Sequence, residues 1–130
     1  MNLPLIAANV LTILAFFVHV FAGDKEVRTI EPREQTQGKP REVWTLLRCS
    51  FHWLSIDLLF AAILMSLINL SLITEHQDIY LKLLWIYFLS YGVIWLLTIR
   101  ISRSFPKNYL LLGQWMLVIV IGGLSWWASI

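Results

Sequence analysis

Four long runs of apolar residues follow one another along the chain, over residues 3–22, 43–73, 80–99 and 109–130. A helix that crosses a bilayer needs about 20 mainly apolar residues, and each run reaches that length. One polar segment, residues 23–42, separates the first two runs and holds ten of the eighteen charged residues. The pattern predicts an all-α, polytopic integral membrane protein, in which residues 1–130 form a single four-transmembrane-helix bundle.

The basic residues are distributed unevenly around these runs. Nine of the ten Lys and Arg residues lie in or beside loop 23–42, or between the third and fourth runs, and only Lys82 lies elsewhere. Short loops rich in Lys and Arg remain in the cytoplasm. We therefore expect loop 23–42 to be cytoplasmic and both termini to lie outside.

The composition supports the membrane class and excludes others. Hydrophobic residues make up 58% of the chain and charged residues 14%, whereas soluble domains have about 45–50% and 25%. The net charge of +2 is too small to indicate nucleic-acid binding. A single cysteine, Cys49, cannot form a disulfide scaffold.

Small and polar residues recur at helical spacing within each run, and such residues mark the faces by which membrane helices pack together. We expect five of them in the bundle interior and three long aliphatic residues at the periphery. The interior set is Asn9, Ser66, Tyr91, Gln114 and Gly122, and the peripheral set is Leu64, Leu97 and Leu111.

Ionisable residues inside the runs are the strongest functional signal, because they are costly in a bilayer. His19 lies about one turn inside the first run, while Arg48 and His52 lie about one and two turns inside the second. The predicted topology brings all three to the cytoplasmic half. Ser55 shares the polar stripe of Arg48 and His52, and Gln114 enters at a similar depth from the fourth run. This arrangement predicts a ligand-binding or polar cluster of these five residues.

Two histidines on adjacent helices also allow a cofactor. They could supply both axial ligands of a b-type haem, with Arg48 pairing with a propionate. A metal ion held by His19, His52 and Asp24 is a variant of the same hypothesis.

Asp57 points away from this cluster. It follows Arg48 by nine residues, which turns it to the opposite side of a regular helix. Carboxylates inside a membrane are functional by default. Asp57 could therefore carry protons in a small transporter that works as an oligomer, although the first run lacks the carboxylate typical of small multidrug resistance transporters.

The residues His19-Val20-Phe21-Ala22-Gly23-Asp24, followed by Arg48, Phe51, His52 and Ser55, resemble a pattern in uncharacterised small bacterial inner-membrane proteins. Those proteins show His-x-x-x-Gly-(Glu/Asp) at the end of the first span and Arg-x-x-(Trp)-His-x-x-Ser at the start of the second. Here Phe51 replaces the usual Trp. The resemblance implies a multi-pass protein of the bacterial inner (plasma) membrane and implies no activity.

No pattern typical of a P-loop, a catalytic triad or a nucleophile elbow is present in the sequence. We therefore expect an accessory or binding protein rather than an enzyme, with the lipid bilayer as its surroundings. A homo-oligomer or a larger membrane complex is the expected assembly.

Overall fold

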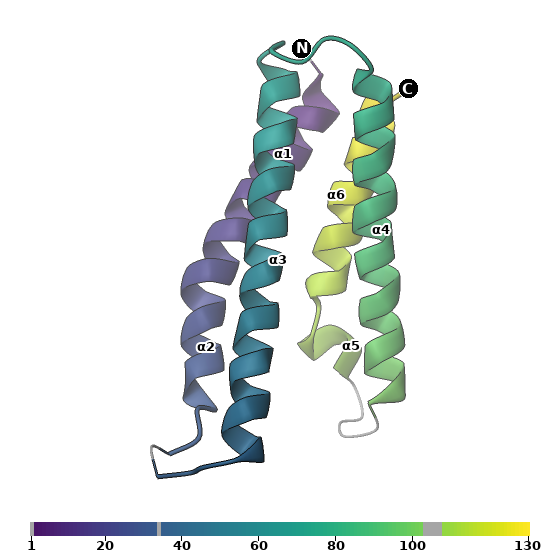
Figure 1. The fold of residues 1–130 in the computed structure, drawn as a ribbon. Helices are drawn as coiled ribbons and strands as arrows, with labels where there is room; N and C mark the ends of the chain where they lie inside the picture. The colour runs from purple at the N-terminus through teal and green to yellow at the C-terminus, as the bar shows by residue number, and fades with distance from the viewer. Residues whose placement is uncertain (1, 34, 103–107) are drawn as a thin grey trace. The chain divides into compact units, whose positions relative to one another are not determined.

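The computed structural model describes residues 2–33, 35–102 and 108–130. All regular elements within these ranges are helices (Figure 1). In chain order they are α1 (Leu3–Phe17), the π-helix η1 (Val18–Gly23), α2 (Asp24–Thr29), α3 (Lys39–Asn69), α4 (Gln77–Ile101), α5 (Asn108–Leu111) and α6 (Gln114–Ala128).

Three of these helical segments are long and apolar enough to cross a membrane. They are the continuous segment Leu3–Thr29, with 27 residues, α3 with 31 residues and α4 with 25 residues. Many of their large apolar side chains are exposed, as expected where lipid replaces water as the solvent. The predicted class, a helical chain with several candidate membrane spans, is therefore confirmed.

The fourth predicted span, residues 109–130, is interrupted. It consists of the short α5 and the 15-residue α6, with Gly113 preceding α6 at φ −72° and ψ 4°. At 1.5 Å per residue α6 is about 22 Å long, less than the ~30 Å hydrocarbon core of a bilayer. Gly113 separates the two pieces because its backbone leaves the helical region at this point.

The first polar loop is shorter than the predicted segment 23–42. The helix continues through η1 and α2 to Thr29, and α3 already begins at Lys39. Asp24 and Arg28 form an ion pair one turn apart on α2, and pairs with this spacing stabilise helices. The charged residues after Ala22 therefore extend the helix instead of ending it.

The end of α3 also differs from the predicted boundary at residue 73. Ser71 adopts a left-handed conformation with φ 57°. Its N–H bonds the carbonyl of Ile68, while the N–H of Leu72 bonds the carbonyl of Leu67. These two bonds form a Schellman motif, which satisfies the last carbonyls of the helix and stops it after Asn69.

The chain divides into two compact units, residues Met1–Leu11 with Leu64–Ile130, and residues Thr12–Ile63. In the first unit, the Asn2 side chain caps α1 by accepting from the N–H of Leu5 at 3.2 Å. Its amide also donates to the carbonyl of Ala128 at 2.9 Å. Asn9 donates to the Ser66 hydroxyl at 2.9 Å, which joins α1 to α3.

Helices α4 and α6 pack side by side in this unit (Figure 1). A Cβ atom on Gly122 would lie 3.2 Å from Cβ of Phe88 and 3.4 Å from the carbonyl oxygen of Trp85. A Cβ atom on Gly92 would lie 2.7 Å from the Ile119 side chain. The two glycines therefore permit the close approach that membrane helices use in place of hydrophobic association.

Most of the residues predicted to lie in the bundle interior are buried or partly buried. Asn9 and Gly122 are buried, and Ser66 and Tyr91 are partly buried. The prediction for Gln114 is wrong, because this residue begins α6 after the break at Gly113 and is exposed. Leu97 and Leu111 are exposed as expected, whereas Leu64 is partly buried.

Candidate functional site

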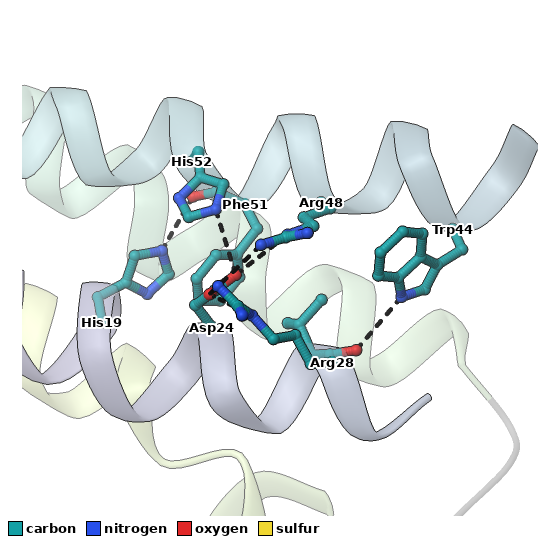
Figure 2. A network of polar contacts seen from close by, with 8 residues as sticks. His19, Asp24, Arg28, Trp44, Arg48, Phe51 and His52 are labelled. Atoms are coloured by element: carbon teal, nitrogen blue, oxygen red, sulfur yellow. Dashed lines mark hydrogen bonds and ion pairs between the residues drawn. The ribbon is translucent and has the colours of Figure 1, made fainter. Parts of the chain in front are cut away.

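The candidate site lies within the second unit and depends on the π-helix η1. At its end, the backbone N–H of Asp24 donates to the carbonyl of His19, five residues earlier. In a regular α-helix, residues five apart are turned about 140° from each other. The i→i+5 turn is wider and aligns them, so His19 and Asp24 both face α3 (Figure 2).

Gly23 allows this face to approach α3 closely. A Cβ atom at this position would lie 2.5 Å from Cζ of Phe51, a distance that two carbon atoms do not tolerate. The His19 ring stacks on the Phe51 ring, with centroids 3.7 Å apart and planes 17° apart. Phe51 on α3 therefore packs against both His19 and Gly23.

His19 is also tied to the backbone of α3. Its Nε2 lies 3.0 Å from the carbonyl oxygen of Phe51. A carbonyl can only accept a hydrogen bond, so Nε2 carries the proton and donates. This bond defines the tautomer of His19 and leaves Nδ1 as the acceptor of the neutral ring.

Asp24 is the centre of the polar cluster (Figure 2). Arg28 donates to its Oδ2 from Nε at 2.8 Å and lies 2.7 Å away through a terminal nitrogen. Arg48 donates from Nε to Oδ1 at 3.2 Å and from a terminal nitrogen to Oδ2 at 3.5 Å. Nε2 of His52 lies 3.3 Å from Oδ1. One carboxylate thus contacts three basic side chains, and two of them, Arg48 and His52, join α2 to α3.

The Asp24 carboxylate is buried, whereas its three basic partners are partly exposed. The Asp24 side chain is 11% exposed, against 60% for Arg28, 32% for Arg48 and 43% for His52. Trp44 closes one side, since its Nε1 donates to the carbonyl of Val27 at 3.3 Å and its ring lies 5.6 Å from the Arg48 guanidinium carbon. The cluster therefore presents cationic groups outward around a buried anion.

Ser55 completes the predicted α3 motif and is buried, with 4% of its surface exposed. Its hydroxyl has no hydrogen-bond partner among the described residues. A helical serine usually donates to the carbonyl four residues earlier, which here is the Phe51 carbonyl that accepts from His19. The Ser55 side chain therefore lies beside the cluster without bonding to it.

The other two predicted site residues do not join these contacts. Gln114 begins α6 in the first unit, where its side chain is exposed, so its assignment to the cluster has no support. Asp57 is partly buried on α3. The contacts of Asp24 described above involve neither residue.

The geometry does not favour the cofactor hypotheses. A ligating histidine must offer a nitrogen lone pair. Nε2 of His19 donates to Phe51 and Nε2 of His52 faces Asp24, so only Nδ1 of either ring could serve as a ligand without breaking these contacts. Across residues 2–33, 35–102 and 108–130, no three His, Cys, Asp or Glu side chains are placed to hold a metal ion. His19 is thus bonded to the backbone of α3, and His52 pairs with Asp24, so Nε2 of each ring already has a partner.

The central role of Asp24 and the contributions of Arg28 and Trp44 are not predicted from the sequence, where Asp24 enters as a metal ligand and as the last residue of the first motif. Two signals point to them. Asp24 and Arg28 have the spacing of a helical ion pair. Arg48 requires a nearby anion, and Asp24 is the acid that directly follows the first predicted span.

No protein-family model, curated protein or solved structure matches this chain.

Proposed function

We propose that this chain is a small integral membrane accessory or binding protein, and that the Asp24 cluster (His19, Asp24, Arg28, Arg48 and His52) is its binding site. The observation that carries the proposal is the burial of one carboxylate beneath three basic side chains that remain partly exposed. The carboxylate holds the basic side chains in place, and their exposed N–H groups remain available as charged donors. These donors can bind an anionic group without a nucleophile or a metal.

The proposal includes four membrane spans with both termini outside. Residues 109–130 would form the fourth crossing, through α5 and α6 together. The cluster would lie near the cytoplasmic side of a bacterial inner membrane. The excess of Lys and Arg around α2, the start of α3 and the end of α4 supports this orientation. The surroundings are the lipid bilayer, and the assembly is a homo-oligomer or a larger membrane complex.

The orientation is tested with alkaline phosphatase fused after Ile130 in a bacterial host. The enzyme folds only outside the cytoplasm, so the proposal predicts an active fusion. A fusion after Gly38, in the linker between α2 and α3, should be inactive. The reverse pair of activities would contradict the orientation.

The binding function is tested by native mass spectrometry of the chain released gently from its own membranes. The wild-type protein should carry a noncovalently bound species. The variant Arg48→Gln should lose it, because Arg48 supplies donors from α3. Arg100→Gln changes an exposed base at the end of α4 and should retain it.

Circular dichroism and size-exclusion chromatography of both variants confirm that each is folded. If Arg48→Gln fails this check, Arg28→Gln replaces it, because the Arg28 side chain is 60% exposed. A wild-type chain that carries nothing, or a folded cluster variant that carries the same species, would contradict the proposed function.

A further inference from the structure

The charges of the Asp24 cluster do not balance. Two guanidinium groups, which are always protonated in proteins, face one carboxylate, and His52 adds a third basic group. In the part of the chain that the structure describes, neither arginine forms an ion pair with any other acid. At least one positive charge is therefore left without a counter-charge at the start of α3.

Some N–H donors of Arg28 and Arg48 also remain without a bond to Asp24. Each guanidinium has five N–H donors, and Asp24 is contacted by Nε and one terminal nitrogen of each. The second terminal nitrogen of both arginines makes no contact with the carboxylate. Since Arg28 and Arg48 are partly exposed, these donors are accessible to a ligand that approaches from outside.

Arg41 extends the same surface. It precedes Trp44 by three residues and Arg48 by seven, so the three share one face of α3. Its Nε is buried, and none of the described residues accepts a hydrogen bond from it. A buried cationic donor without an acceptor is rare in proteins, and a bound anion would satisfy it.

We infer that this face binds the phosphate group of an anionic phospholipid through Arg28, Arg41 and Arg48. The inference rests on the proposed function and names its ligand class. Guanidinium forks match phosphate well, because its oxygens accept paired hydrogen bonds. Phe21 on η1 and Leu47 on α3 are exposed apolar residues in the same unit, and they suit the acyl chains that accompany a lipid phosphate but not a free phosphate ion.

The test uses the full chain with isotope-labelled arginine in dodecyl maltoside micelles, which contain no phosphate. The Nε–H resonances of Arg28, Arg41 and Arg48 are followed by NMR as phosphatidylglycerol is added, with Arg100 as the internal control. We expect the three resonances to shift together and saturate while that of Arg100 remains constant.

Two variants show which donors are responsible. Arg28→Gln should weaken phosphatidylglycerol binding at Arg48 by about tenfold, since it removes one charged fork. Arg33→Gln, a change to an exposed base in the linker, should leave the affinity unchanged. Equal binding by both variants would overturn the assignment.

Inorganic phosphate and oleate identify the chemistry of the ligand. Inorganic phosphate that shifts the same resonances at equal concentration would overturn the lipid assignment in favour of a free anion. Oleate as effective as phosphatidylglycerol would overturn the phosphate assignment, although the cluster would still be a binding site. Arginine resonances that respond to none of the three compounds, phosphatidylglycerol, inorganic phosphate or oleate, would refute the inference. The proposed function is decided separately, by whether native mass spectrometry finds a bound species.

Discussion

Asp24 and His19 are five residues apart, yet they face the same helix, because the Asp24 N–H donates to the His19 carbonyl in a π-helical turn. The site depends on this one turn. His19 can reach the Phe51 carbonyl while Asp24 reaches Arg48 and His52 only if the helix widens between them. Single π-turns inside α-helices are frequent at functional sites.

Deletion of Ala22, an exposed residue within η1, should preserve the cluster. His19 and the aspartate would then be four apart in a regular α-helix and would share one face. Insertion of one alanine after Ala22 should disrupt it, since each added residue turns the helix by about 100°. Thermal unfolding in detergent, followed by circular dichroism, should show the insertion much less stable than the deletion. The opposite order would contradict the role of the π-turn.

Replacement of Gly23 by alanine should lower the free energy of unfolding by about 1–3 kcal/mol, the usual effect of overpacking. The added Cβ would lie 2.5 Å from the Phe51 ring. Gly123 is the matched control, because nothing lies within 4 Å of a Cβ built there. Gly123→Ala should be neutral or stabilising, since alanine favours a helix. Similar losses for both variants would refute the close contact.

His19→Gln should retain most of the stability that His19→Leu loses. Glutamine can donate to the Phe51 carbonyl from its amide nitrogen, whereas leucine leaves that acceptor without its partner. The loss for leucine is expected to be about 0.5–1.5 kcal/mol, the net contribution of one hydrogen bond. If unfolding in detergent shows equal stability for the two variants, the hydrogen bond contributes nothing.

Asp24→Asn should destabilise the protein more than Asp78→Asn. Asp24 is covered and contacts three basic groups, so its loss leaves partly buried charges without a partner. Asp78 pairs with Lys82 on an exposed surface, where ion pairs contribute little. The comparison requires the unfolding midpoints of both variants under the same conditions. Equal midpoints would show that Asp24 is not the centre of the cluster.

Spacing and depth alone predict that His19, Arg48 and His52 meet at one end of the helices. Within the second unit, Arg48 and His52 both contact Asp24, and His19 bonds the Phe51 carbonyl on α3 (Figure 2). They mark the site because ionisable residues are rare in apolar helices and recur here at helical intervals. The helical class is equally predictable, since each apolar run is long enough to indicate a membrane-spanning helix.

Asp24 could not be placed by the same reasoning. It follows the end of the first apolar run, and a regular helix would turn it about 140° from His19. No residue pattern predicts a π-turn, so its effect on Asp24 is visible only in the structure. The exposure of Gln114 has a related cause, because the break at Gly113 begins a new helix whose orientation does not follow from residues 109–112.

The contact between Asp24 on α2 and Arg48 on α3 holds the cluster together, and a double-mutant cycle measures it directly. The free energy of unfolding in detergent is compared for the wild type, Asp24→Asn, Arg48→Gln and the double variant. Residues in one ion-pair network couple, whereas independent residues have additive effects. We predict that the double variant loses clearly less stability than the sum of the two single losses. Strictly additive losses would contradict the contact and, with it, the binding site proposed around Asp24.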